Sequence, residues 1–367
     1  MEEILSLTSE LIRFKSTHSR VEEIRRCAAF VQEWLESHNI GCRRIDQNGI
    51  PSILALPAGN TVSLLLMSHL DVVEGTDEQF QPFERDGRLY GRGSIDDKYA
   101  VALSLVLLKN RLQGCREAGG GQADLAFGIL ITGDEEVGGA NGAKRVLPEI
   151  RAEFCIALDG GRPEKIIVKE KGILHLKLVA RGRTAHAARP WLGSNAIENL
   201  IADYRRIQAF FAPPSPADPE HWHRTINFST VQAGKSLNQV PDRAEACFDV
   251  RYTENDDPDG VVADIRSVIE GELTVETVEP LFFSRPSPYL DRLRAVAPKA
   301  DFGAEHGASD ARYLSAYGMN GVVWGAEGNL SQHSTEEHVV IESIDRLYRM
   351  LDKLVVLEAD AVPPAGS

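Results

Sequence analysis

LLLMSHLDVV, residues 64–73, is a short apolar run that leads into a histidine and an aspartate. An apolar run of this length predicts a buried strand. Similar runs follow at Leu125–Ile131 and Phe154–Leu158, and the segment Lys98–Leu112 between them has the pattern of a helix. This alternation predicts an α/β fold with a mainly parallel sheet and helices on both faces.

The middle of the chain has a different pattern, in which apolar and polar residues alternate. The alternation over residues 174–179 and 245–252 predicts half-buried strands of an antiparallel sheet. Two amphipathic helical patterns accompany these strands. We therefore expect a smaller α+β domain over residues 172–284, inserted into a discontinuous larger domain made of residues 1–171 and 285–367.

The composition argues against several classes of protein. The net charge of −14 opposes binding to nucleic acids or to anionic membranes, because both need a basic face. The five cysteines are scattered and include no CxxC pair, which is typical of reduced thiols. The N-terminus does not read as a secretion signal, and no apolar stretch reaches the roughly 20 residues of a membrane span. We expect a soluble, cytoplasmic protein.

Histidine and carboxylate side chains recur at the ends of predicted strands or after a Gly-rich turn, where α/β sheets place their sites. They are His69 and Asp71 in HLD, Asp96 and Asp97 in GRGSIDDK, Asp134, Glu135 and Glu136 in GDEE, Asp159 in LDGG, and His333, Glu337 and His338 near the C-terminus. One such acid alone is more often a helix cap or a solvated charge. Recurrence of imidazole and carboxylate, without cysteine, predicts a site for Zn²⁺ or a similar cation.

The order of these motifs resembles the M20 family of metallopeptidases and deacylases, which includes dipeptidases, aminoacylases, acetylornithine deacetylases and succinyl-diaminopimelate desuccinylases. HLD, GRGSIDDK, DEE, a strand-ending acid, GRTAHAARP, GASDAR and a late histidine follow in that order over nearly the whole chain. The resemblance implies two divalent metal ions, zinc with cobalt or manganese as alternatives. Asp96 would bridge the ions, His69 and Asp159 would complete one site, and Glu136 and His333 the other. A shared carboxylate reduces the repulsion between two cations.

The resemblance also implies roles for residues that bind no metal. Glu135 would act as general base. The role of Asp71 follows from strand geometry instead, because residues two apart share a face, so Asp71 could hold the ring of His69 through its second nitrogen. His186, in GRTAHAARP, would stabilise the developing oxyanion, with Asn238 of SLNQVPD in support. Arg312, in GASDAR, would bind a substrate carboxylate. A surface turn is the alternative for His186, and a structural salt bridge is the alternative for Arg312.

Two departures from the family pattern bear on the substrate. DDKYA stands where many deacylases carry DMKG, and Asp159 stands where some relatives carry glutamate. Both features resemble the dipeptidases and aminopeptidases of the family. Tyr99, which stands in place of the usual glycine, matches neither these enzymes nor the deacylases. We expect cleavage of a dipeptide or short peptide, with an N-acylated amino acid as the alternative substrate. A metal-binding pseudoenzyme is the alternative outside the enzymes, and the presence of all five ligands and Glu135 opposes it.

The resemblance adds two structural expectations. The peptide bond between Asp96 and Asp97 should be cis. The inserted domain should mediate a homodimer, because an antiparallel sheet has an edge strand that pairs readily with another chain. Monomeric relatives have an enlarged lid, whereas this one is small. Whether His186 acts within its own chain or across the dimer stays open.

Overall fold

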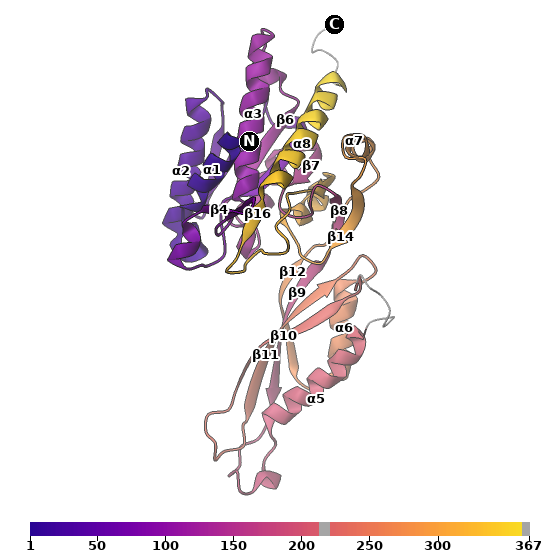
Figure 1. The fold of residues 1–367 in the computed structure, drawn as a ribbon. Helices are drawn as coiled ribbons and strands as arrows, with labels where there is room; N and C mark the ends of the chain where they lie inside the picture. Colours follow the sequence, from indigo (N-terminus) through magenta and orange to yellow (C-terminus); the bar gives the residue numbers. More distant parts are fainter. Residues whose placement is uncertain (213–220, 362–367) are drawn as a thin grey trace. The chain divides into compact units, whose positions relative to one another are not determined.

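The computed structural model describes residues 1–212 and 221–361, which form two compact units (Figure 1). The larger unit contains Met1–Lys169, Ser284–Glu305 and Ser309–Ser367, and the inserted unit contains Glu170–Phe283 and His306–Ala308. Within the described ranges, no helix combines the length and the apolar character needed to cross a membrane.

The larger unit is built on a sheet whose central strands are parallel. The strand order is β1-β2-β6-β3-β7-β15-β8, and β14 pairs with β8. The strands are β1 (Arg43–Gln47), β2 (Ile50–Ala55), β3 (Thr61–His69), β6 (Phe127–Thr132), β7 (Arg151–Ala157), β8 (Lys165–Glu170), β14 (Asp301–Glu305) and β15 (Gly321–Val323). β6, β3, β7 and β15 run parallel, whereas β1, β2 and β8 pair antiparallel. The strand that contains LLLM is therefore central.

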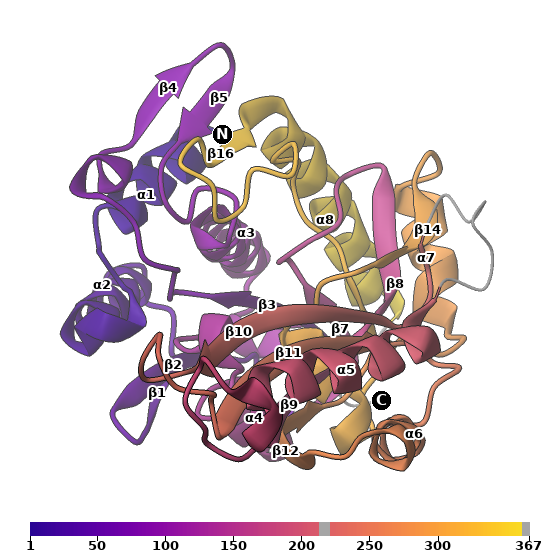
Figure 2. The same cartoon turned by 90° about the horizontal axis from the view of Figure 1, so that it is seen from below.

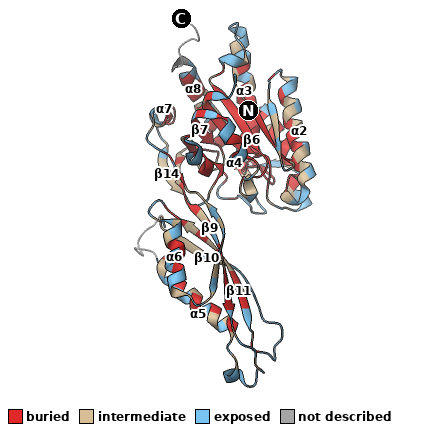
Figure 3. Cartoon of the chain, turned by 180° about the vertical axis from the view of Figure 1, so that it is seen from behind, coloured by how far each residue is buried: buried red, intermediate tan, exposed pale blue. Residues whose placement is uncertain are grey.

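Long helices cover one face of this sheet (Figures 1 and 2). They are α1 (Glu2–Ile12), α2 (Val21–Ser37), α3 (Lys98–Glu117), α7 (Pro288–Val296) and α8 (Ile341–Ala361). Their apolar side chains share one core with alternate strand residues, such as Leu64 and Leu66 of β3. Buried residues accordingly concentrate in the sheet and in the helix faces that contact it (Figure 3).

Shorter segments cover the other face. The strand residues that belong to this other face, such as Leu65 and Cys155, are also buried. The covering segments are α4 (Ala143–Val146) and the 3-10 turn η8 (Asp310–Tyr313), which contacts α4, β7 and β15. The predicted α/β fold with a mainly parallel sheet and helical segments on both faces is confirmed.

A small second sheet lies beside the start of α3. It has the order β16-β5-β4, with β4 at Phe83–Arg85, β5 at Arg88–Tyr90 and β16 at His338–Val340. β5 leads into the Gly-rich turn before α3, and β16 pairs with it. Residues near 90 and near 338 are thereby brought together.

The inserted unit is an antiparallel sheet with two helices on one face. Its strand order is β10-β11-β9-β12. The elements are β9 (Gly172–Arg181), α5 (Ala196–Gln208), β10 (Thr225–Ala233), β11 (Arg243–Tyr252), α6 (Pro258–Val268) and β12 (Glu272–Glu279), and the short β13 (Phe282–Phe283) follows. Leu176 and Leu178 of β9 pack with Leu200 of α5 and Ile265 of α6 in its core.

Tyr99, which fits neither side of the family pattern, has a structural role. Its side chain is fully buried, and its hydroxyl donates a hydrogen bond to the carbonyl of Leu158 at 2.6 Å. The same hydroxyl accepts the N–H of Ala326 at 2.8 Å. Tyr99 thus joins the start of α3 to the ends of β7 and β15.

We predict that Tyr99→Phe destabilises the protein, because it leaves the N–H of Ala326 and the carbonyl of Leu158 buried without this partner. The expected loss of unfolding free energy is about 1–3 kcal/mol, measured by urea denaturation. Tyr348→Phe is the control, since its hydroxyl bonds to Asn110 at an exposed position and should matter by less than about 0.5 kcal/mol. Equal losses in the two variants would contradict the role assigned to Tyr99.

Candidate metal centre

Three of the polar motifs meet at the carboxyl end of the parallel strands. β3 ends in His69, β6 is followed by the 3-10 turn η4 (Glu135–Val137), and Asp159 lies two residues beyond β7. Because β3 lies between β6 and β7, these residues are adjacent although they are far apart in sequence. Asp96 comes from the Gly-rich turn before α3, and His333 from the loop before β16.

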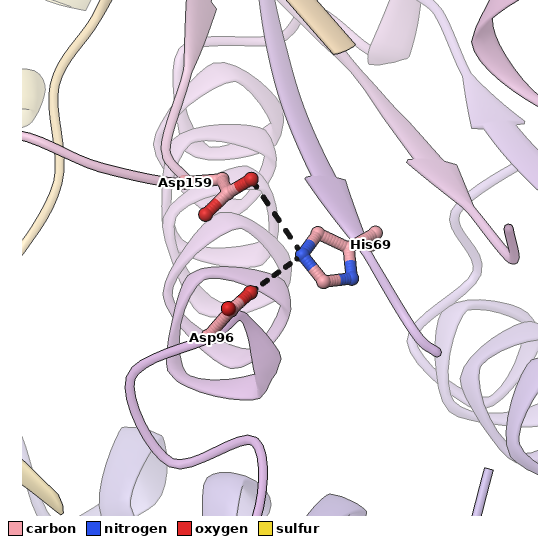
Figure 4. Close-up of side chains that lie close together, drawn as sticks. All are labelled: His69, Asp96 and Asp159. Carbon is pink, nitrogen blue, oxygen red and sulfur yellow. Dashed lines mark hydrogen bonds and ion pairs between the residues drawn. The ribbon is translucent and has the colours of Figure 1, made fainter. Parts of the chain in front are cut away.

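The first group consists of His69, Asp96 and Asp159, and it is shown in Figure 4. The Nε2 atom of His69 lies 2.9 Å from Oδ1 of Asp96 and 3.7 Å from Oδ2 of Asp159. The other ring nitrogen, Nδ1, donates a hydrogen bond to the backbone carbonyl of Asp71 at 3.0 Å. In the neutral ring this bond leaves the lone pair on Nε2, which faces the two carboxylates and is available to a cation.

The second group consists of Asp96, Glu136 and His333. Nε2 of His333 lies 3.0 Å from Oδ2 of Asp96 and 3.1 Å from Oε2 of Glu136. Asp96 thus turns one carboxylate oxygen toward each histidine. Each group offers one imidazole and two carboxylates, which suits zinc and leaves coordination positions open. The structure brings all five predicted ligands together.

The carboxylates make this region strongly attractive to cations. Hydrogen bonds with Asp96 and Glu136 raise the pKa of His333 to about 10. Burial, together with the charge of Asp96, raises the pKa of Glu136 above its usual value, although the hydrogen bond with His333 lowers it in part. A divalent cation would relieve the repulsion between these acids, so the donor set fits a metal ion.

Asp71 supports both groups from a fully buried position. Its Oδ1 and Oδ2 accept the backbone N–H groups of Glu135 at 3.1 Å and of Glu136 at 3.0 Å. Its Oδ1 is also 3.4 Å from Nδ1 of His69, so the backbone carbonyl and not the carboxylate makes the shorter contact with the ring. Although burial opposes it, the rings of His18 and His69, at 3.5 and 3.4 Å from its oxygens, lower the pKa of Asp71 to about 2.

Glu135 lies beside the metal groups but belongs to neither. Burial, and repulsion from Asp159, raise its pKa well above the usual value. Its Oε1 is 3.6 Å from Nη2 of Arg312, and the same nitrogen is 3.8 Å from Asp310. Arg312 is buried, and its Nε and Nη2 atoms have no hydrogen-bond partner among the described residues.

Comparison with known proteins agrees with this geometry. The model of peptidase family M20/M25/M40 matches residues 65–356. The chain belongs to this family. A succinyl-diaminopimelate desuccinylase of Methylorubrum extorquens is 30% identical over 316 residues, which are 77% of this chain and 80% of that protein. Another, from Xanthomonas euvesicatoria pv. vesicatoria, is 26% identical and covers 98% of this chain and 100% of its own length.

Solved structures of M20 proteins have the same fold. A tripeptidase from Staphylococcus aureus gives a TM-score of 0.79 at 20% identity, with 98% of each chain covered. An M20 family metallo-carboxypeptidase from Sulfolobus solfataricus also gives 0.79, at 19% identity, with 98% of this chain and 100% of that chain covered. The family recognised from the motif order is confirmed.

His186 and Asn238 lie together in the inserted unit of this M20 chain. Both are exposed. The N–H of Ala187 donates to the carbonyl of Asn238 at 3.0 Å, and His186 forms a β-bridge with Gln239. The two loops that the family pattern marks out are thus bonded to each other.

Two residues, Arg92 and Glu337, hold the turn of Asp96 in a way that the sequence did not indicate. Glu337 pairs with Arg92 and accepts the N–H of Gly93 at 2.9 Å, and it also lies 3.4 Å from the N–H of Asp96. Burial raises the pKa of Glu337 to about 7. Its position beside His333 suggested a metal site, but it supports the turn instead. The peptide bond between Asp96 and Asp97 is cis, as expected.

We predict that Asp96→Ala reduces binding of two cations, whereas Asp159→Ala reduces binding of one. The reason is that Asp96 contributes an oxygen to each group and Asp159 to the first group only. Zinc content after dialysis, determined by elemental analysis, and titration calorimetry with Zn²⁺ would measure this difference. Asp86→Ala is the control, because that residue lies in an exposed turn and should leave the zinc content unchanged. Loss of a single ion in Asp96→Ala would exclude a shared ligand.

Proposed function

We propose that this chain is a two-metal hydrolase that cleaves the peptide bond of a dipeptide or short peptide. The observation that carries the proposal is the sharing of Asp96 by two groups, together with a carboxylate at Glu135 that belongs to neither group. His69 and Asp159 would hold one ion with Asp96, and Glu136 and His333 the other. Two divalent ions, for which we propose zinc, would supply Lewis acidity and a water with a pKa lowered to about 7.

Glu135 would act as general base. Its side chain is 10% exposed, and the backbone N–H groups of Glu135 and Glu136 are held by Asp71. Because burial raises its pKa, Glu135 can accept a proton from the attacking water. It would then deliver that proton to the leaving amine.

Arg312 would bind a substrate carboxylate. The Nε and Nη2 donors of this buried guanidinium have no hydrogen-bond partner in the described residues, and the carboxylates of Glu135 and Asp310 lie 3.6 and 3.8 Å from Nη2. Such donors favour an anionic ligand, because unsatisfied buried donors are costly. Its planar fork suits a carboxylate. Peptides and succinylated amino acids both carry that group, so Arg312 supports an acidic substrate without distinguishing the two classes.

Deacylation of an N-acylated amino acid is the second candidate function. It is favoured by the names of the relatives, since the matched proteins at 26–30% identity are succinyl-diaminopimelate desuccinylases. The DDKYA stretch and Asp159 favour the peptide. The two functions share the same metals, base and amide chemistry, and they differ in the group on the acyl side.

A substrate panel tests the choice between them. With Zn²⁺ added, we predict that dipeptides give a kcat/KM at least about tenfold above that of N-succinyl or N-acetyl amino acids. Glu135→Ala is the matched control, because it should keep both ions and lose about 10²–10⁴-fold in turnover. A preference for acylated amino acids would favour the second function. Two bound ions with no cleavage of either class by the wild type would favour a pseudoenzyme.

We also propose that the inserted unit forms a homodimer through β10. This strand lies at an edge of its sheet, and its residues Ser229–Ala233 are all exposed, on both faces. Large apolar side chains are exposed in the same unit, among them Trp191, Leu192, Ile201, Val231 and Leu237, and also Val278 on the opposite edge strand β12. An unpaired edge strand with apolar neighbours favours pairing with a second copy.

Dimerisation can be tested on the two edge strands of the same sheet. We predict that Val231→Arg, on β10, gives a monomer by light scattering at micromolar concentration, because a charge opposes burial at the interface. Val278→Arg, on the opposite edge strand β12, is the matched control and should remain a dimer. A monomeric wild type would refute the interface. Recovery of activity in mixed dimers of His186→Ala and Glu135→Ala would indicate that His186 acts across it.

A further inference from the structure

The segment from Phe14 to His18 is bonded to the chain that carries the metal centre. The hydroxyl of Ser16 donates to the carbonyl of Leu70 at 2.6 Å, and the N–H of Val72 donates to the carbonyl of Ser16 at 3.0 Å. The buried ammonium of Lys98 donates to the carbonyl of Phe14 at 2.7 Å. These bonds hold the segment against Leu70 and Val72, which lie in the HLD motif and directly after it.

His18 extends from this segment toward Asp71. Its Nε2 atom lies 3.5 Å from Oδ2 of Asp71, which is an ion-pair contact and not a hydrogen bond, and the side chain of Asp71 is fully buried. The same carboxylate receives the N–H groups of Glu135 and Glu136 and lies beside the ring of His69. Asp71 therefore contacts a residue of each metal group, and His18 contacts Asp71.

The contact between His18 and Asp71 matters because the carboxylate of Asp71 is both charged and buried. A buried carboxylate is unstable unless hydrogen bonds or an opposite charge compensate it. His69 cannot supply a full positive charge while its Nε2 lone pair binds a cation. Among the described residues, His18 is the side chain in contact with this carboxylate that belongs to neither metal group.

We propose that His18 is a positioning residue of the metal centre. By holding the carboxylate of Asp71, it fixes the ring of His69 in the first group and the backbone of Glu135 and Glu136 beside the second. Loss of this contact should weaken both cation sites together, unlike loss of a ligand that belongs to one group. The proposal rests on the proposed function only in treating the two groups as metal sites.

The experiment measures cation affinity in the full-length chain by chelator competition with Zn²⁺. His18→Ala should weaken both sites by up to about tenfold, the lower end of the range for residues that orient metal ligands. It should lower kcat more than it changes KM. His18→Gln, whose amide N–H can donate to the carboxylate of Asp71, should recover part of the affinity. Lys15→Gln is the matched control, because it breaks an exposed contact of the same segment with Asp77.

A double-mutant cycle with Asp71→Asn separates this role from general destabilisation. If His18 acts through Asp71, His18→Ala should have little further effect on affinity in the Asp71→Asn background. Full additivity, or an unchanged affinity in His18→Ala, would overturn the proposal. An equal loss in Lys15→Gln would also overturn it, since the effect would then belong to the whole segment. A wild type that binds no cation would overturn the proposed function and this inference together.

Discussion

The carboxylate of Asp96 can contact both His69 and His333 only while one of its oxygens is directed at each ring. Nothing in an isolated Gly-rich turn enforces that orientation, so other parts of the chain must. Glu337 and Arg92 hold the turn from one side, and α3 begins directly after it. At the start of that helix, Tyr99 bonds to the ends of β7 and β15. The shared ligand thus depends on contacts that reach across the larger unit.

The ligand residues could be predicted from the sequence because their positions follow from topology. Parallel strands end at one edge of a sheet, so His69, Glu136 and Asp159 had to come close once their strands were recognised. Asp96 and His333 do not follow a strand of the parallel sheet, so only the family pattern assigned them as ligands. The order of strands was not predictable in this way, since it depends on which apolar faces pack together.

The supporting residues were not predictable, because their partners are distant in sequence. Glu337 contacts the turn near Gly93 across 244 residues, and its place beside His333 made it look like a ligand. His18 lies in a polar stretch with no strand or motif around it. Tyr99 stood out only as a departure from the family pattern, and its two hydrogen bonds explain it. Such contacts are set by tertiary packing, on which local patterns carry little information.

The distance between Gly93 and Glu337 along the chain has a consequence for biosynthesis. The residues of the first group have all been made once Asp159 has left the ribosome, well before His333 and Glu337. The turn that carries Asp96 still lacks the carboxylate that accepts its N–H groups at that stage. Long-range contacts form late because their loop-closure entropy must be overcome first. A nascent chain of that length therefore has the first set of ligands without the Glu337 carboxylate that holds the turn of Asp96.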